Sequence, residues 1–129
     1  MQHAGDILVI DDHPATVEFI ADALTDDGYS VRTAPDAARA RVAIAERQPD
    51  LVLADLHLPG KPGDLLARDL HNDGLADVPV IIMTADARWV SAQPMDGIAF
   101  CLAKPFNLDD LLHCVAAHVR RAGGMNVER

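Results

Sequence analysis

Five short apolar runs divide the chain at fairly regular intervals. They cover residues 7–10, 29–32, 51–54, 78–83 and 98–103. The second run is weak, whereas three of the others are continuously apolar and do not alternate with polar positions. Continuous short runs are typical of strands buried on both faces of a parallel sheet. The pattern therefore predicts five strands in one buried parallel sheet.

Between these runs, apolar residues recur with the period of an α-helix. Pro14 stands at a natural first helical position behind Asp12 or His13 as the cap, and Gly28 is a stop signal. Residues 84–97 have only weak helical periodicity, which predicts a short or irregular fourth helix. The other predicted helices cover residues 36–47, residues 64–73 and a last segment that Asn107 caps and Gly123-Gly124 closes.

The regular alternation of strands and helices predicts an α/β fold. Short connections between the elements favour a doubly wound parallel sheet with helices on both faces and right-handed crossovers. A chain of 129 residues is expected to form one domain. We expect that domain to span residues 1–129 with its core at about 6–121, and residues 122–129 to be a tail or the start of a linker.

Composition and charge exclude several classes of protein. Half of the residues are hydrophobic, so the chain is not expected to be disordered, and 20 acidic against 11 basic residues give a net charge of −9. This balance argues against a nucleic-acid partner. No apolar run is long enough for a membrane helix and no signal peptide is evident, so we expect a cytoplasmic protein without membrane contact. Its two cysteines are then expected to be reduced core residues.

Polar side chains follow four of the five predicted strands. The first strand is followed by Asp11-Asp12, the third by Asp55, the fourth by Thr84 and the fifth by Lys104. In an open parallel sheet, ligands bind beyond the carboxyl ends of the strands. We therefore expect these five side chains to converge on one edge of the sheet.

The charges of this group imply a bound cation. Three carboxylates at close range repel one another, and the single positive charge of Lys104 offsets only one of them. A hard divalent ion with oxygen ligands would offset the rest, and Mg²⁺ suits such a site. A simpler role for Asp11 or Asp12 is to cap the helix that begins at Pro14, but capping does not account for the other residues of the group.

The same residues carry a resemblance to a known family. Asp11-Asp12, Asp55, Thr84-Ala85 and Lys104-Pro105-Phe106 resemble the signature of the receiver domain of two-component response regulators. Residues 49–60 are similar to that family's phosphoacceptor strand and the loop after it, and the match covers about residues 6–121. The resemblance implies a flavodoxin-like (βα)5 sandwich with strand order 2-1-3-4-5.

Site roles follow from this resemblance residue by residue. Asp55 would be the phosphoacceptor, taking a phosphoryl group from a phosphohistidine on a histidine kinase or a histidine phosphotransfer protein. Asp12 and Asp55 would bind Mg²⁺ directly, with Mn²⁺ as an alternative ion. Asp11 would act through water, and the backbone carbonyl of His57 would complete the protein ligands.

Further residues would contact or surround the phosphoryl group. Lys104 would pair with its oxygens, and Thr84 would donate its hydroxyl once the group is present. The side chains of His57 and Asp86 would border the group and tune its lifetime. The resemblance also implies a cis bond before Pro105.

The sequence departs from the family where the signal is usually read. Cys101 stands where receivers commonly have the switch Tyr or Phe, and the neighbouring Phe100 should point to the opposite face of its strand. Residues 84–97 are also short for the family. Trp89 could be an exposed contact, a lid on the site or an ordinary packing residue. We expect phosphorylation with an atypical output through the fourth helix, fifth strand and fifth helix, the face through which a homodimer or a downstream protein would bind.

Other functions remain as alternatives. A pseudo-receiver would keep the fold as a protein-binding or dimerisation module without phosphorylation. A phosphatase-type hydrolase would need a second aspartate that the Asp55-Leu56-His57 segment lacks, and a flavin carrier would need a phosphate-binding loop in place of acidic loops. We therefore expect no enzyme activity beyond self-directed, Mg²⁺-dependent phosphoryl transfer and autodephosphorylation.

Overall fold

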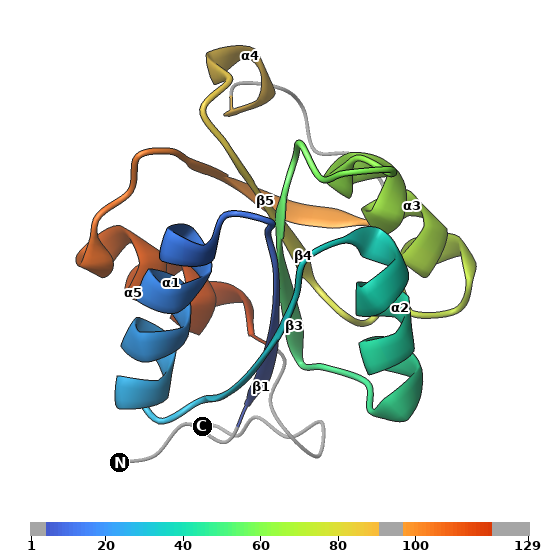
Figure 1. Ribbon diagram of the computed structural model, residues 1–129, viewed down its shortest axis with the longest axis horizontal. Coiled ribbons are helices and arrows are strands. Elements are labelled where there is room, and N and C mark those ends of the chain that lie inside the picture. The colour runs from blue at the N-terminus through green and yellow to red at the C-terminus, as the bar shows by residue number, and fades with distance from the viewer. Residues whose placement is uncertain (1–4, 91–96, 120–129) are drawn as a thin grey trace.

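A computed structural model describes residues 5–90 and 97–119, which fold into one five-stranded sheet flanked by helices (Figure 1). All pairings are parallel and the strand order is β2-β1-β3-β4-β5. The strands are β1 (Asp6–Ile10), β2 (Ser30–Ala34), β3 (Leu51–Asp55), β4 (Val80–Thr84) and β5 (Ile98–Ala103). The helices are α1 (Pro14–Asp26), α2 (Ala37–Glu46), α3 (Gly63–Asn72), α4 (Ala87–Val90) and α5 (Leu108–His118). This architecture confirms the predicted doubly wound fold and its strand order.

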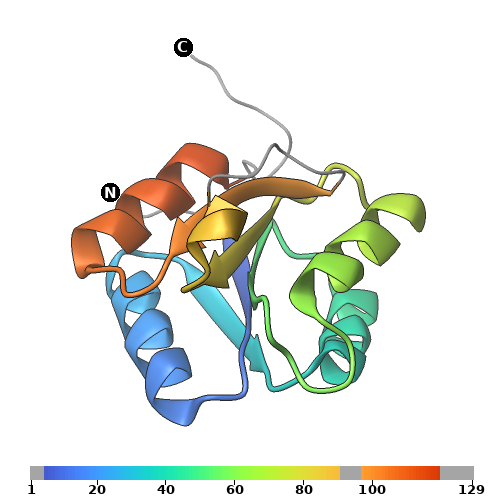
Figure 2. The same cartoon turned by 90° about the horizontal axis from the view of Figure 1, so that it is seen from above.

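Two apolar layers cover the two faces of the sheet. Figures 1 and 2 show α1 and α5 together on one face and α2 and α3 together on the other. Because neighbouring strand residues point to opposite faces, β1 contributes to both layers. The α2/α3-side core includes Leu8, Ile10, Ala40, Ile44, Val52, Ala54, Leu66, Leu70 and Ile82. The α1/α5-side core includes Ile7, Val9, Ile20, Leu24, Leu53, Ile81, Met83, Leu111 and Val115.

Burial separates the central strands from the edges. Every residue of β1, β3 and β4 is buried, whereas β2 and β5 each have several exposed or half-buried positions. The apolar run at residues 29–32 is weak because β2 is an edge strand in which most positions are exposed or half-buried, and the strand lies slightly later, at Ser30–Ala34. Likewise β4 begins at Val80, two residues later than the apolar run.

The helix ends are set by local chemistry. Asp36 accepts a hydrogen bond from the Arg39 backbone N–H at the start of α2, and a reciprocal pair between Asn107 and Asp110 begins α5. Gly28, with φ +99°, follows α1 as predicted. Helix α5 ends at His118 with an extended Val119, so Val119 is not helical, and Gly123-Gly124 and the predicted tail lie outside the described residues.

The start of α1 corrects one interpretation of the sequence. His13 is the N-cap residue, but no side chain caps the helix. Asp11 instead accepts a hydrogen bond from the His13 backbone N–H at 3.0 Å. The capping role considered for Asp11 or Asp12 is therefore wrong, since neither carboxylate binds an N–H group of the first helical turn.

Two further features complete the fold. Helix α4 has four residues, which agrees with the predicted short fourth helix, although residues 91–96 lie outside the description. Within residues 5–90 and 97–119, no helix has the length and apolar character required to span a bilayer.

Candidate functional site

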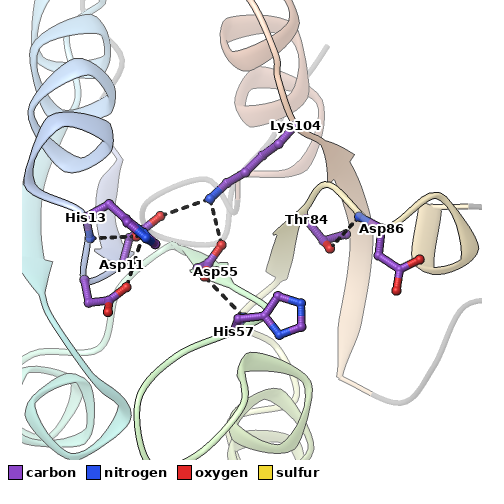
Figure 3. Close-up of polar contacts among 8 residues, drawn as sticks. Asp11, His13, Asp55, His57, Thr84, Asp86 and Lys104 are labelled. Carbon is purple, nitrogen blue, oxygen red and sulfur yellow. Dashed lines mark hydrogen bonds and ion pairs between the residues drawn. The ribbon is translucent and has the colours of Figure 1, made fainter.

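The carboxyl ends of the strands form the candidate site. Asp11 follows β1, Asp55 ends β3, Thr84 ends β4 and Lys104 follows β5. Because all five strands are parallel, these residues come to the same edge of the sheet, and Figure 3 shows their side chains gathered there. Of these four residues, Asp11, Asp55 and Thr84 are buried.

Lys104 joins the acids of two strands. Its Nζ lies 2.7 Å from Asp55 Oδ1 and 3.4 Å from Asp11 Oδ2. Burial alone would lower the pKa of Lys104, but the hydrogen bond to Asp55 and the charges of Asp11 and Asp55 outweigh it and raise the pKa above its usual value. The ammonium therefore stays charged at neutral pH and offsets part of the negative charge of the edge.

The acidic residues and one histidine form a potential metal site. Asp11, Asp12, His13 and Asp55 each offer a ligand atom, and these four atoms lie within 4.8 Å of one another. Asp11 and Asp55 are buried, whereas Asp12 and His13 reach solvent. Three carboxylates face one nearby lysine, so a divalent cation suits both the charge and the oxygen donors.

The sequence allows His13 to lie near this cluster, in which hard oxygen ligands predominate and argue against a zinc site. Its Nδ1 lies 2.8 Å from Asp11 Oδ1 and 3.2 Å from Asp12 Oδ1. The hydrogen bond to Asp11, followed by the charges of Asp11 and Asp12, raises the pKa of His13. In the sequence, this contact is indicated by the position of His13 directly after Asp11-Asp12. A short turn then places its ring over both carboxylates.

The backbone after β3 fixes the carboxylate of Asp55. Asp55 Oδ2 accepts a hydrogen bond from the His57 backbone N–H at 3.2 Å. The Gly63 N–H donates to the Leu56 carbonyl at 2.9 Å, which closes the intervening loop. Gly63 lies so close to β3 that a Cβ atom there would be 2.4 Å from the Asp55 carbonyl oxygen. A residue without a side chain is therefore required at this position.

Thr84 lies at the same edge but forms a different contact. Its Oγ1 accepts a hydrogen bond from the Asp86 backbone N–H at 3.0 Å. The hydroxyl proton can therefore be donated to another group. Asp86 itself is held by Arg88, whose hydrogen bonds lower the pKa of the Asp86 carboxyl. In Figure 3 this carboxylate points away from Asp55.

Cys101 and its neighbour Phe100 lie on opposite sides of β5. Cys101 is half-buried and packs against the α2/α3-side core, as does Trp89 from α4. Phe100 is 45% exposed, and its ring stacks on His118 of α5 with centroids 5.1 Å apart. The prediction that Phe100 faces away from Cys101 is confirmed. Trp89 packs on the core, although part of its surface reaches solvent.

An apolar pocket lies beside Lys104. It has a volume of about 450 Å³, and Phe19, Lys104, Pro105 and Phe106 are among its lining residues. The rings of Phe19 and Phe106 are tilted with their centroids 6.5 Å apart. The peptide bond between Lys104 and Pro105 is cis, as the resemblance implies. The pocket places exposed aromatic surface next to the acidic cluster.

The strand order and the polar strand ends define a doubly wound α/β domain with an acidic, lysine-containing edge. Residues 7–116 match the model of the response regulator receiver domain. The chain belongs to this family of two-component signalling proteins. The alternative of a pseudo-receiver is therefore not favoured.

Curated relatives agree with this assignment. The chain is 38% identical over 120 residues to the phosphate regulon transcriptional regulatory protein PhoB of Pseudomonas aeruginosa, covering 91% of the chain and 52% of PhoB. It is 35% identical over 117 residues to the sensor histidine kinase RcsC of Salmonella typhi, covering 89% of the chain and 12% of RcsC. The chain therefore spans about half or less of the length of these relatives.

Solved structures show the same fold. A putative response regulator from Chloroflexus aurantiacus has a TM-score of 0.84 at 27% identity, over 92% of this chain and 99% of that chain. The receiver domain of NtrX from Brucella abortus has a TM-score of 0.80 at 30% identity, over 88% of this chain and 97% of that chain.

Proposed function

We propose that Asp55 accepts a phosphoryl group from a phosphohistidine of a histidine kinase or a histidine phosphotransfer protein. The observation that carries this proposal is the position of Lys104, with Nζ 2.7 Å from Asp55 Oδ1. Of the carboxylates in the cluster, Asp55 has the shorter lysine contact, ends a central strand and is supported by the His57 N–H. A fixed carboxylate next to a cation suits nucleophilic phosphoryl transfer.

The residues of the cluster fit a divalent metal ion. Asp12 and Asp55 would hold Mg²⁺ directly, Asp11 would act through water, and the His57 carbonyl would add a further oxygen. Mn²⁺ accepts the same oxygen ligands and is an alternative. When bound, the ion would supply positive charge to the oxygens of the transferring phosphoryl group.

The protein side chains have separate tasks in the transfer. An Asp55 oxygen forms a bond to phosphorus while the phosphorus–nitrogen bond of the donor breaks, and the electron pair returns to the imidazole nitrogen. Lys104 would stay beside Asp55 and neutralise a phosphoryl oxygen. Thr84 would donate its hydroxyl proton to another oxygen, since its Oγ1 already accepts from Asp86. Hydrolysis of the aspartyl phosphate would return the domain to its first state, and no other substrate is proposed.

Two neighbouring residues would affect the lifetime of the aspartyl phosphate. The ring of His57 is exposed, two residues after Asp55, and would border the path of an attacking water. The Asp86 carboxylate is engaged by Arg88 and points away from Asp55, so its effect requires that the Arg88 contact opens.

The partner would dock beside Lys104. The pocket lined by Phe19 and Phe106 gives apolar contact area next to the acceptor carboxylate. A helix that bears the phosphohistidine would place its apolar residues there while the imidazole reaches Asp55. A cytoplasmic location suits this partner and the free thiols of Cys101 and Cys114.

The signal would leave through α4, β5 and α5, to a second copy of the domain or to a downstream protein. Cys101 is too small to repeat the movement of a switch ring. Trp89 packs on the same core from α4, and its backbone N–H bonds the carbonyl of Asp86, whose own N–H bonds Thr84. Movement of Thr84 toward phosphate would therefore reach Trp89 through Asp86.

An acyl-phosphate assay tests the proposed function. The protein is incubated with a small acyl-phosphate donor and Mg²⁺, and its intact mass is measured for the wild type and for Asp55→Asn. We expect the wild type to gain one phosphoryl group and the variant to gain none. No gain in the wild type at high donor concentration would instead support a binding module without phosphorylation.

A further inference from the structure

Arg88 holds the carboxylate of Asp86 beside the phosphoacceptor edge of the sheet. Its guanidinium donates two hydrogen bonds, from Nε to Asp86 Oδ1 at 3.1 Å and from a terminal nitrogen to Asp86 Oδ2 at 2.9 Å. The Arg88 backbone N–H adds a third bond, to Oδ1 at 2.9 Å. In Figure 3 the carboxylate points away from Asp55. The arginine side chain therefore supplies most of the contacts that keep this carboxylate directed away from the acceptor.

The backbone of Asp86 is fixed at the site, whereas its side chain is not. Its N–H donates to Thr84 Oγ1 at 3.0 Å, and its carbonyl accepts from the Trp89 N–H at 3.0 Å. The contact with Thr84 keeps Asp86 next to the carboxyl end of β4, where the acceptor lies. Rotation about the Cα–Cβ bond is then the movement that redirects the carboxylate while the backbone stays in place.

Electrostatics place Asp86 within range of the acceptor loop. The hydrogen bonds from Arg88 are the main cause of the lowered pKa of the Asp86 carboxyl, and the charge of His57 contributes to the same shift. His57 binds Asp55 through its backbone N–H. The carboxylate thus interacts with a residue of the acceptor loop even while Arg88 holds it. Because its pKa is lowered, the held carboxylate is also a weaker base than a free one.

The contact between Arg88 and Asp86 can open in solution. The side chain of Arg88 is 91% exposed, and that of Asp86 is 23% exposed. Ion pairs at the surface are weak and are screened by salt. The Asp86 carboxylate is therefore released for part of the time, and the strength of the arginine contact sets how often this happens.

We propose that Arg88 is a positioning residue that slows hydrolysis of the aspartyl phosphate by holding Asp86 away from it. The inference rests on the proposed function and deepens it. When the contact opens, Asp86 turns toward the phosphoryl group and accepts a proton from the attacking water. The water oxygen bonds to phosphorus, the bond from phosphorus to the Asp55 oxygen breaks, and its electron pair returns to the Asp55 carboxylate. Inorganic phosphate leaves, and Asp86 gives its proton to solvent.

The lifetime of the aspartyl phosphate in a double-mutant cycle tests the inference. The whole chain is labelled with radioactive acetyl phosphate and Mg²⁺, the donor is removed by gel filtration, and the loss of label from the protein is followed. We expect Arg88→Met to lose its label about two- to fivefold faster than the wild type, since a surface pair is already open part of the time. Arg88→Met/Asp86→Asn should lose its label at the rate of Asp86→Asn alone, because neither protein has a carboxylate to release.

Two further variants and added salt separate positioning from general effects of charge. Arg88→Lys keeps a cation without the paired donors and should fall between the wild type and Arg88→Met. Arg47→Met removes an exposed arginine that contacts Asp6 at the amino end of β1, and it should keep the wild-type rate. Added salt should accelerate hydrolysis in the wild type and have little effect in Arg88→Met.

Three results would overturn the inference. They are equal rates in the wild type and Arg88→Met, slower loss of label in Arg88→Met, and an acceleration that persists in the double variant. Persistence would show that Arg88 acts through the local structure of α4 and not through the Asp86 carboxylate. Failure of the proposed function is distinguishable, because the wild type would then take up no label, and the inference would be overturned together with it.

Discussion

Lys104 and Asp55 form an ion pair of 2.7 Å between the ends of β5 and β3. The two strands are not neighbours, since β4 lies between them in the sheet. The lysine thus spans the edge above β4 and brings its charge to a carboxylate that is buried against the sheet. This contact offsets part of the negative charge at this edge of the sheet.

Removal of the Lys104 charge should destabilise the metal-free protein. Lys104→Met leaves the buried carboxylates of Asp55 and Asp11 without their cation, and we expect the free energy of unfolding to fall by about 2 kcal/mol. Lys61→Met is the matched control, because the contact of Lys61 with Asp69 is at the surface and should contribute less than about 1 kcal/mol. Urea denaturation without metal measures both values. Equal losses in the two variants would contradict the special role of Lys104.

Loss of the Thr84 hydroxyl should separate phosphorylation from read-out. In Thr84→Ala, Asp55 and Lys104 remain, so most of the phosphorylation by an acyl phosphate should be retained. The connection from Thr84 through Asp86 to Trp89 is broken, and Trp89 is the only tryptophan of the chain. The fluorescence change of Trp89 on phosphorylation should therefore disappear in this variant. Thr25→Ala, at an exposed position of α1, should keep it; the same signal in Thr84→Ala would disprove the connection.

A methyl group at residue 63 should disturb the acceptor strand. Gly63→Ala would place Cβ 2.4 Å from the Asp55 carbonyl oxygen, and we expect a destabilisation of about 1–3 kcal/mol together with reduced phosphorylation. Gly74→Ala is the control, because Gly74 has φ +94° but open space around the added Cβ. That variant should lose about 1 kcal/mol through backbone strain alone and should phosphorylate normally. Normal phosphorylation of a folded Gly63→Ala protein would show that the close approach does not position Asp55.

The two thiols should react slowly and in a fixed order. Burial raises the pKa of Cys101 and raises that of Cys114 to about 11, so both are protonated at neutral pH. Because the thiolate is the reactive form, the rate of reaction with a disulfide reagent should rise as the pH increases from 7 toward 10. Cys101 is half-exposed and should react before Cys114. The single-cysteine variants Cys101→Ala and Cys114→Ala assign the two phases, and equal rates in both would contradict the burial difference.

Much of the fold follows from the sequence, because central strands and edge strands differ in their solvent exposure. The continuous apolar runs of β1, β3 and β4 indicate burial on both faces. The structure confirms this, because every residue of these three strands is buried. The bounds of β2 were less predictable, since Arg32 and Thr33 on this edge strand interrupt the apolar run. Arg32 contacts Asp6 at 2.7 Å, and no local pattern of residues predicts that long-range pair.

The positions of the site residues also follow from the sequence, because a parallel sheet brings all strand ends to one edge. The hydrogen-bond partners do not follow, since they depend on side-chain rotamers and on loop geometry. Asp11 shows the difference: one of its oxygens binds His13 and the other faces Lys104, a residue 93 positions away. The engagement of Asp86 by Arg88 was likewise not evident from the spacing of the two residues.

Direct mapping of the phosphorylated residue tests the central claim. The protein is phosphorylated with an acyl phosphate and Mg²⁺ and reduced with borohydride, which converts an aspartyl phosphate to homoserine. Peptide mass spectrometry then locates the change. We predict homoserine at position 55 and at no other aspartate position. Homoserine at position 11 or 12, or no homoserine at all, would contradict the assignment of Asp55 as the phosphoacceptor.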